Sequence, residues 1–537
     1  MARKSLLILA GILVFALALR VYKLSQLSLY GDELTMVEDS YSLLKTGRDQ
    51  TGALFPLTFK MGAGRPAGYV YFSIPFVALF GPSAWGVRGL SVLSSLGIIL
   101  VAYFLVKQLL NQKVALLASF LVAVSPWDLS LARGGFESHF ALFLALWGVY
   151  LLLKVREGKW NLVWAILLWG LTVNTYPTYK LILSVLFCIM LWFLGGIKNL
   201  LPKQKSILIL AVVLAVEVIG LTLAQTFVGG SENRFLNINL FASNKSSVEQ
   251  DINFNRSVDS GSPLSARLFY NKPLSYFKLL GTSYLKNFSV EYLVINGDGQ
   301  PRHNMTGSGV IYVVEIVTIF LGIKYFLDQK TKRREFIFIL SWLLIAPIAA
   351  AFTLDNHGLR TNFMLPPLVI FSSLGIYQLI QLKKPLILAA VVFIWLVQFV
   401  PMLERLYFLS PNRFARFWSN MAKVVATESF RQKGDYDYIV ISSRVDNVEY
   451  AYPVYNRIDP KEVIAENTGK SLLNGYKFKQ FGNVYIGSVP AEKLTTFLNL
   501  LPGKVKYYGP FDEAGFLGAH SVLYDKDKMS SVLTYEK

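Results

Sequence analysis

The stretch Leu29-Tyr-Gly-Asp-Glu-Leu-Thr35 places two adjacent carboxylates, Asp32 and Glu33, directly after the first long apolar run of the chain. Carboxylates just past a membrane helix are costly unless they face water or a site within the protein. We therefore expect the pair to lie at the mouth of a cavity on the outer membrane face. The alternative for the pair taken alone is a solvated helix start, where the helix dipole favours negative charge.

The bulk composition indicates a polytopic membrane protein. Of the 537 residues, 53% are hydrophobic and only 16% are charged, whereas roughly a quarter are charged in soluble domains. Apolar runs of about 20 residues recur, which is the length of a helix that crosses a bilayer. The net charge of +19 comes largely from short basic loops between these runs. This pattern follows the positive-inside rule, so nucleic acid is not an expected partner.

The loop charges also predict the topology. Arg3 and Lys4 precede the first apolar run, which we interpret as an uncleaved span with a cytoplasmic N-terminus. The apolar segment 69–81 is too short to span and is predicted to be re-entrant or interfacial, which leaves every basic loop inside. We predict an all-α bundle of about eleven transmembrane helices in the plasma (inner) membrane, with spans near 5–23, 88–107, 113–130, 137–154, 160–176, 179–197, 206–226, 309–327, 335–353, 361–381 and 385–403.

This topology predicts a transmembrane catalytic domain over 1–403, with long outer loops at 25–87 and 227–308, and a soluble extracytoplasmic α/β domain over 404–537. In the first loop, the apolar spacing predicts an amphipathic interfacial helix from Asp32 to Lys45, ended by Thr46-Gly47. In the tail, segments 435–442 and 482–487 are predicted as strands and 491–501 as a helix.

Basic and acidic residues at outer span ends are the further candidates for a site. Arg65 follows a glycine-rich stretch and suits bidentate phosphate binding, although snorkelling toward headgroups is an alternative. Arg88 begins the second span. Arg133 and Glu137 lie four residues apart, so they either form a structural ion pair or face a wet cavity.

Three of the four histidines, His139, His303 and His357, fall at predicted outer turns. Each alone is more often structural. Together, with Arg302 and Arg360 beside them, they favour a shared site on one membrane face. Such a site suits a lipid phosphate whose tail stays in the bilayer, because arginines can hold the phosphate while a carboxylate reaches an acceptor.

At these residues the chain resembles the GT-C glycosyltransferases, in particular the branch of protein O-mannosyltransferases and lipid A aminoarabinose transferases. The resemblance covers roughly residues 1–400. The family often has Asp at the position of Glu137, and the tail 404–537 matches no module of the family. The matching elements are, in chain order, Asp32-Glu33, Arg65-Pro66, Val87-Arg88, Ser125-Pro126, Ala132-Arg133 with Glu137, Pro301 to Asn304 and His357 to Arg360.

The resemblance implies a hexosyl- or pentosyltransferase that uses a polyprenyl-phosphate sugar and acts on the outer face. The acceptor would be a hydroxyl of a protein, a glycolipid or a cell-wall glycan. Asp32 would be the general base of an inverting displacement, and Glu33 and Glu137 would orient the sugar or hold an arginine. The phosphate would be neutralised by Arg65, Arg88, Arg302 and Arg360. The family implies no metal cofactor and the sequence offers no obvious metal cage, which leaves a divalent cation open.

Two other classes stay open as hypotheses. A transporter or flippase of lipid-linked sugars needs polar residues near the bilayer midplane. Here the strong charges lie at span ends, with Glu217 and Glu315 as exceptions. The third class is a non-enzymatic receptor or scaffold that acts through the outer tail.

Overall fold

The computed structural model describes residues 2–228, 240–353, 356–469, 471–518 and 520–537. The chain forms two compact units, each built from separate segments. Unit 1 consists of Met1–Arg20, Leu93–Ala132 and Phe136–Leu403, and unit 2 consists of Val21–Val92, Arg133–Gly135 and Glu404–Lys537. Part of the predicted loop 227–308, residues 229–239, lies outside the described residues.

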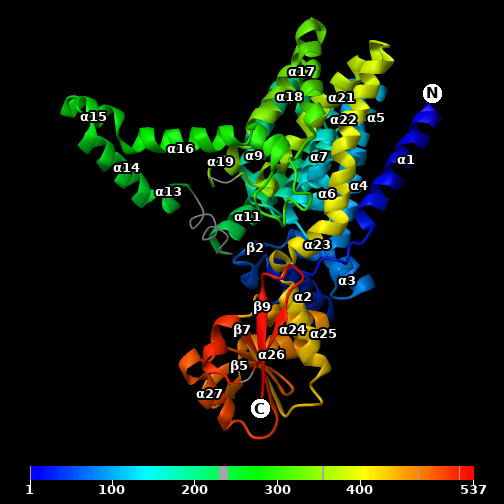
Figure 1. Ribbon diagram of the computed structural model, residues 1–537. Helices are drawn as coiled ribbons and strands as arrows, with labels where there is room; N and C mark the ends of the chain where they lie inside the picture. The colour runs from blue at the N-terminus through cyan, green and yellow to red at the C-terminus, as the bar shows by residue number, and fades with distance from the viewer. Residues whose placement is uncertain (1, 229–239, 354–355, 470, 519) are drawn as a thin grey trace. The chain divides into compact units, whose positions relative to one another are not determined.

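Unit 1 is a bundle of mostly apolar helices (Figure 1). Helix α4 (Ala84–Leu109) begins in unit 2 and continues into this bundle. The other helices are α1 (Ala2–Val21), α5 (Gln112–Val124), α6 (Pro126–Ala132), α7 (Glu137–Leu153), α8 (Trp160–Val173), α9 (Thr178–Leu194), α10 (Ile197–Leu200), α11 (Lys205–Leu223), α13 (Leu240–Ser243), α14 (Lys245–Val258), α15 (Pro263–Phe269), α16 (Lys272–Lys286), α17 (Val313–Asp328), α18 (Arg333–Ile345), α19 (Ile348–Ala351), α20 (Gly358–Thr361), α21 (Leu365–Gln381) and α22 (Pro385–Glu404).

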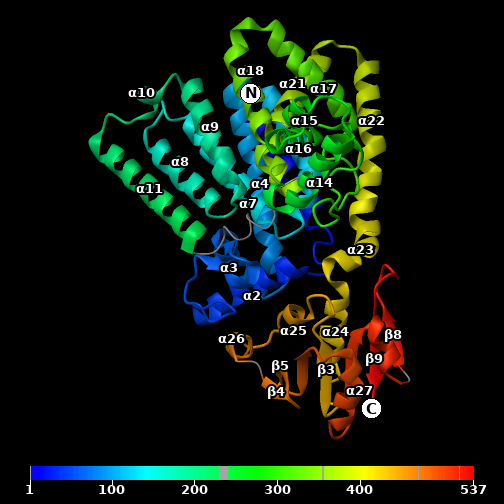
Figure 2. The same cartoon turned by 90° about the vertical axis from the view of Figure 1, so that its left-hand side faces the viewer.

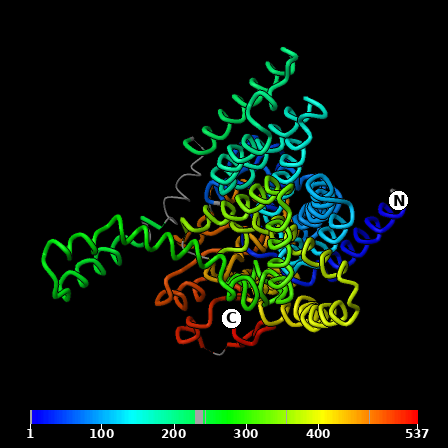
Figure 3. The backbone as a smooth tube through the Cα atoms, turned by 90° about the horizontal axis from the view of Figure 1, so that it is seen from above, coloured from blue at the N-terminus to red at the C-terminus, as the bar shows by residue number. Residues whose placement is uncertain are grey.

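Helices of the bundle pack both on chain neighbours and on helices far away in the sequence. Helices α8, α9 and α11 lie side by side, as Figure 2 shows. Helices α14 and α16 pack on each other and form an arm, green in Figure 3, that contacts the bundle through α19. The tightest pair is α17 with α21, where Gly322 and Gly375 bring the two backbones into contact. Small residues permit such close approach between apolar helices, which in lipid associate by packing rather than by hydrophobic burial.

Six described helices are long and apolar enough to cross a membrane, or seven if the bent pair α5–α6 counts as one span. Four further apolar helices, α7, α8, α9 and the short α3 (Gly68–Phe80), are shorter. The mostly helical architecture is therefore confirmed, whereas the number of about eleven spans stays a prediction.

Two predicted spans contain a proline that affects the helix. The span predicted at 113–130 is two helices, α5 and α6, which meet at a 56° bend before Pro126. The span predicted at 335–353 has only a local turn at Pro347, between α18 and α19, and Lys330–Ala351 still qualifies as one membrane-crossing helix. Proline removes a backbone donor and restricts the residue before it, so a continuous helix is disfavoured at both places.

Unit 2 combines the first loop with the tail. The loop forms α2 (Gly31–Thr46), a hairpin of β1 (Thr58–Phe59) and β2 (Arg65–Pro66), and α3. The tail has α23 (Ser410–Arg413), α24 (Asn420–Arg431), α25 (Val448–Asn456), α26 (Pro460–Thr468) and α27 (Ala491–Leu500). Its strands are β3 (Tyr438–Ser442), β4 (Ser471–Leu473), β5 (Tyr476–Phe481), β6 (Val484–Gly487), β7 (Val505–Pro510), β8 (His520–Tyr524) and β9 (Ser531–Glu536).

The tail is an α/β fold around one seven-stranded sheet of order β4-β5-β6-β3-β7-β9-β8. Strand β3 runs parallel to β6 and β7, with Ile439 opposite Val484 and Tyr438 opposite Val505. The remaining pairs are antiparallel. Phe478, Phe497 and other apolar side chains form its core beside α27. The predicted strands near 435–442 and 482–487 and the helix at 491–501 are confirmed.

Helix α2 begins and ends where the sequence predicts, with Gly47 in the left-handed conformation (φ 69°) as its C-cap. Its surroundings differ from the prediction of one apolar face against a membrane interface. Ten of its sixteen residues are buried, and it packs on α3, α25 and α26. The compact units also divide at residue 404, but unit 2 includes the first loop, because α2 packs on helices of the tail.

Candidate functional site

The paired carboxylates lie in the first turn of α2. Tyr30 is the extended residue before the helix (φ −86°, ψ 170°), so Asp32 and Glu33 stand where free backbone N–H groups and the helix dipole favour negative charge. Gly31 packs against the tail, since a Cβ there would come within 2.6 Å of Oδ1 of Asn447. The start of α2 is thus fixed by close contact within unit 2.

Glu33 is fully buried and is held on both carboxylate oxygens. Arg88 donates from Nε to Oε1 and from Nη2 to Oε2, each at 2.7 Å. The backbone N–H of Gly135 donates to Oε1 at 2.7 Å. A bidentate arginine–carboxylate pair of this kind has a fixed geometry. The structure therefore gives Glu33 a positioning role.

Arg88 has no N–H group left for a substrate. Beyond Glu33, its guanidinium donates to three backbone carbonyls, those of Leu24 (2.8 Å), Leu27 (3.1 Å) and Ser28 (2.7 Å). These bonds use all five of its donors. Arg88 was predicted to contact the donor phosphate. In the structure its N–H groups instead bind Glu33 and the backbone carbonyls of the segment that leads into α2.

Asp32 lies in a different environment from its neighbour. Its side chain is 49% exposed, and Oδ1 accepts a hydrogen bond from Nη2 of Arg65 at 2.7 Å. Arg65 itself is 1% exposed and donates from Nη1 to Oγ1 of Thr35 at 3.0 Å. The β1–β2 hairpin presents Arg65, with Ala63 (φ 53°) and Gly64 (φ 79°) making its turn. The arrangement leaves Asp32 open to solvent while a buried cation orients it.

Residues of the tail complete the support of this segment. Trp418 stacks near the Arg88 guanidinium, 5.1 Å from its ring centroid, and meets Tyr30 edge to face at 5.2 Å. The hydroxyl of Tyr455 accepts the N–H of Leu29 at 2.7 Å, and Ser28 donates to Asn420 at 2.8 Å. These residues could not be predicted from the sequence, because nothing in the tail's composition connects them to Ser28 and Leu29, 392 and 426 residues earlier.

Arg133 also joins this unit. It donates to the carbonyls of Tyr22 (2.6 Å) and Lys23 (3.2 Å) and stacks 4.9 Å from the ring centroid of Tyr407. Glu137, its predicted partner, is the first residue of α7 in unit 1. Arg133 therefore links the residues just after α1 to Tyr407 of the tail.

Two further acids on α2, Glu38 and Asp39, are buried to about 1% exposure. Burial, followed by the charge of Asp39, raises the pKa of Glu38 to about 8. Burial raises the pKa of Asp39 to about 7, although hydrogen bonds from Gln50 oppose the rise. Both oxygens of Glu38 lack a hydrogen-bond partner. The amphipathic pattern of α2 places these acids on its polar face, so their burial was not expected from the sequence.

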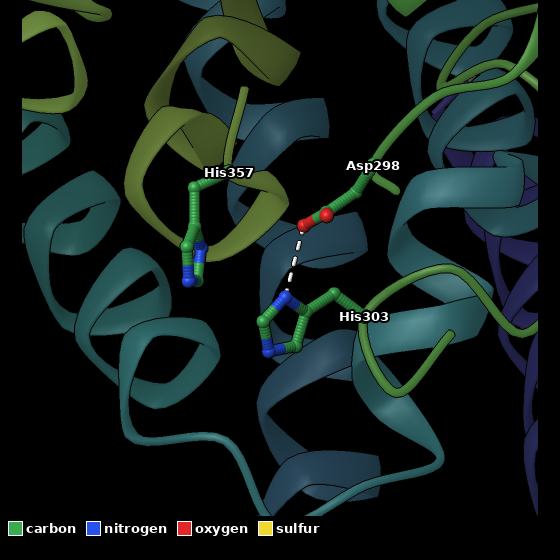
Figure 4. A group of neighbouring side chains, drawn as sticks. All are labelled: Asp298, His303 and His357. Atoms are coloured by element: carbon green, nitrogen blue, oxygen red, sulfur yellow. Dashed lines mark hydrogen bonds and ion pairs between the residues drawn. The ribbon is translucent and has the colours of Figure 1, made fainter. Parts of the chain in front are cut away.

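Unit 1 contains a second cluster of polar groups, formed by Asp298, His303 and His357 (Figure 4). Nδ1 of His303 and Oδ2 of Asp298 are 2.9 Å apart, and the two imidazole centroids are 4.5 Å apart. Burial acts to raise the pKa of Asp298, but the hydrogen bond and charge of His303, with the charge of His357, hold it below its ordinary value. The predicted proximity of His303 and His357 is thus observed, with Arg302 and Arg360 as their neighbours in the chain.

His139, expected to share a site with His303 and His357, lies in another network of charged groups. Its Nε2 is 2.9 Å from Oδ1 of Asp128, whose Oδ2 is 2.6 Å from Nη2 of Arg20. Ser95 hydrogen bonds to the same carboxylate, and all four side chains are buried. This is a closed ion-pair network between helices. Asp128 was missed, although a carboxylate inside an apolar run carries the same cost that singled out Asp32.

Comparisons with known proteins agree with this architecture. Residues 65–219 match the family model described as dolichyl-phosphate-mannose-protein mannosyltransferase. The structure of ArnT from Cupriavidus metallidurans bound to undecaprenyl phosphate is similar with a TM-score of 0.56 at 13% identity, over 98% of this chain and 97% of that one. The apo form of ArnT gives 0.53 at 14%, over 99% and 98%.

A more distant likeness is to the oligosaccharyltransferase AglB from Archaeoglobus fulgidus, with a TM-score of 0.48 at 13% identity. It covers 84% of this chain, which spans 63% of the length of AglB. No curated protein matches the sequence. The chain shares the fold of ArnT, and its residues 65–219 match the family model described as dolichyl-phosphate-mannose-protein mannosyltransferase.

Proposed function

We propose that this chain transfers a sugar from a polyprenyl-phosphate donor to an acceptor hydroxyl, with Asp32 as the general base. The match to a lipid-phosphate-sugar transferase family and the fold shared with ArnT, a protein solved with undecaprenyl phosphate bound, support the reaction class. The sugar is a hexose or pentose, and the acceptor is a protein, a glycolipid or a cell-wall glycan.

One observation carries the assignment of the base. Asp32 and Glu33 are adjacent, yet only Asp32 is accessible, since Glu33 is fully buried and saturated by Arg88 and Gly135. A general base must come within hydrogen-bond distance of the hydroxyl that it deprotonates. The exposed Asp32 is accessible to such a hydroxyl whereas the buried Glu33 is not, which supports Asp32 as the base and Glu33 as a positioning residue.

The proposed reaction is a single inverting displacement. The acceptor oxygen attacks the anomeric carbon as the bond from that carbon to the phosphate oxygen breaks. Asp32 takes the hydroxyl proton, and polyprenyl phosphate leaves with the bonding electron pair. Arg65 holds Asp32 in place through its 2.7 Å bond and adds a positive charge that favours the anionic donor.

The remaining charged residues of the predicted site are proposed as substrate contacts. Arg302 and Arg360 would add positive charge for the donor phosphate, and Glu137 would orient the sugar. Arg133 supports the site through the carbonyls of the first span.

The basic loops favour a cytoplasmic N-terminus and an extracytoplasmic tail in the plasma (inner) membrane, so transfer would occur on the outer face. A cysteine introduced at exposed Asp435, in a chain whose single Cys188 is changed to Ser, tests this orientation. It should react with a membrane-impermeant maleimide in intact cells. Reaction only after lysis would reverse the orientation.

The reaction class is tested by incubating the purified chain with a panel of polyprenyl-phosphate sugars and candidate acceptors. Release of polyprenyl phosphate, together with a glycosylated acceptor, is the expected result. If lipid-linked sugar instead crosses the bilayer of proteoliposomes without any release, the transporter hypothesis replaces this one.

A further inference from the structure

We propose that Asp298, His303 and His357 form a binding site for a divalent transition-metal ion of the Zn²⁺ class. The three residues come from two segments that are far apart in the chain. Asp298 and His303 lie in the loop before α17, and His357 is the residue directly before α20. The site goes beyond the proposed transfer reaction and does not depend on it.

The side chains present their ligand atoms to one another. One oxygen of Asp298 and one ring nitrogen of each histidine all lie within 4.8 Å of each other. In Figure 4 the carboxylate and the two imidazoles surround a common space. Tetrahedral zinc with bonds of about 2.1 Å places its ligands roughly 3.4 Å apart. The observed 2.9 Å between Asp298 and His303 lies close to that value, so small side-chain rotations complete the geometry.

Surrounding groups hold these ligands in position. The N–H of Gly358 donates to Oδ2 of Asp298 at 2.7 Å, and the N–H of Gln300 donates to Oδ1 at 2.8 Å. The ring of Phe136 meets His303 edge to face at 5.6 Å. Metal ligands are characteristically fixed by such outer contacts.

The donor set indicates which ion the site would take. Two imidazoles and one carboxylate suit zinc and related ions, whereas magnesium and calcium prefer oxygen ligands alone. Three protein ligands leave a fourth position open to water or a substrate oxygen. A cavity of about 10 Å³, the space of about one water, borders Asp298 and His303. The bound ion would tie the loop before α17 to the start of α20.

The competing interpretation is an ordinary Asp298–His303 hydrogen bond that holds the two segments without a metal. A direct measurement of metal binding distinguishes a metal site from this hydrogen bond alone. The full chain, purified in detergent and stripped with a chelator, is titrated with Zn²⁺ against a chromophoric competitor. Co²⁺ is then added to the stripped chain, and its visible absorption reports coordination by nitrogen and oxygen.

The variants are His303→Ala and His357→Ala, with His520→Ala as the matched control. His520 is an exposed histidine of the tail, whose Nδ1 contacts the carbonyl of Gly518. We expect one equivalent of Zn²⁺ in the wild type and in His520→Ala. Each site variant should bind at least 10–100-fold more weakly, the loss seen for outer contacts alone. Zn²⁺ should also raise the melting temperature of the wild type but not of the site variants.

Two results would overturn the proposal: a wild-type chain that binds Zn²⁺ no more tightly than the site variants, or equal loss in His520→Ala. The Co²⁺ spectrum of the wild type keeps the test decisive even if a variant fails to fold, because a spectrum of free aqueous Co²⁺ alone would contradict the site. None of these readouts requires sugar transfer, so failure of the metal site and failure of the proposed reaction are distinguishable.

Discussion

At the scale of single residues, Asp32 and Glu33 differ in what surrounds them rather than in chemistry. The Arg88 guanidinium serves Glu33 and three carbonyls of the incoming segment, so one buried ion pair organises the whole start of α2. Asp32 pairs with the buried Arg65, and its side chain is 49% exposed. Replacing either acid therefore has a different expected consequence.

Glu33→Gln should destabilise the fold strongly. Breaking a buried ion pair by removing one partner leaves the other charge uncompensated, which costs about 3–5 kcal/mol. We expect a clearly lower melting temperature and reduced recovery of monodisperse protein. Exposed Glu492, changed to Gln, is the matched control. A melting temperature equal to that of the wild type would contradict the structural role of Glu33.

Glu38 predicts a pH dependence of stability. Its pKa is about 8 in the folded chain against an ordinary value near 4.5, so the folded state holds the extra proton between these two pH values. Stability therefore falls as pH rises through this window, by up to about 1.4 kcal/mol per pH unit. Glu38→Gln should flatten the melting temperature between pH 5 and 8 and raise it at pH 8. An unchanged pH profile would show that Glu38 is not buried as described.

The cost of charge in an apolar chain was enough to predict Asp32, Glu33 and Arg65 as site candidates. The place of His303 and His357 at predicted outer turns likewise led us to expect the proximity that the structure shows. The cost of charge did not separate Glu33 from Asp32, because the separation depends on Arg88 and Gly135, which the fold alone brings to Glu33. Trp418 and Tyr455 were beyond prediction for the same reason, since their contacts join distant segments.

At the scale of elements, most helices begin and end close to the predicted residues, because the length of each apolar run in the sequence sets the length of its helix. The prediction failed at Pro126, where the span bends by 56° into two helices. The close pairing of α17 and α21 was also unpredicted. It depends on two glycines whose role appears only when both helices are seen together.

Gly375→Ala should disrupt this pair of helices. A Cβ at Gly375 would overlap the carbonyl oxygen of Thr318, and backbone cannot yield as a flexible side chain does. Overpacking of this kind costs about 1–3 kcal/mol. Gly220→Ala in α11 is the control, because a Cβ there meets no atom within 4 Å. Equal melting temperatures for the two variants would contradict the close packing of α17 on α21.

At the scale of the whole molecule, composition predicts the membrane bundle and the α/β tail but not how segments group. The first loop and the tail share unit 2, and α2 is covered by α25 and α26 of the tail. Contacts between segments so far apart in sequence leave no local pattern. Composition separates the apolar chain before residue 404 from the polar tail after it. The packing of α2 on α25 and α26 nevertheless places the first loop in the same unit as the tail.

Deletion of residues 404–537 should therefore damage the remaining chain rather than release an independent domain. The deletion uncovers α2 and removes Trp418 and Tyr455 from the segment before it. We expect the truncated chain to aggregate or to lose sugar transfer, as followed by size-exclusion chromatography in detergent and by the release assay. A truncated chain with wild-type activity would contradict the shared unit.

The central claim is that Asp32 is the base, and the rate of polyprenyl phosphate release by Asp32→Asn tests it most directly. Exposed Asp435, changed to Asn, is the matched control, and the melting temperature of each protein is measured beside its rate. The account predicts a loss of about 10²–10⁴-fold for Asp32→Asn at an unchanged melting temperature, the usual contribution of a general base, and no loss for the control. Full activity of a folded Asp32→Asn chain would contradict it.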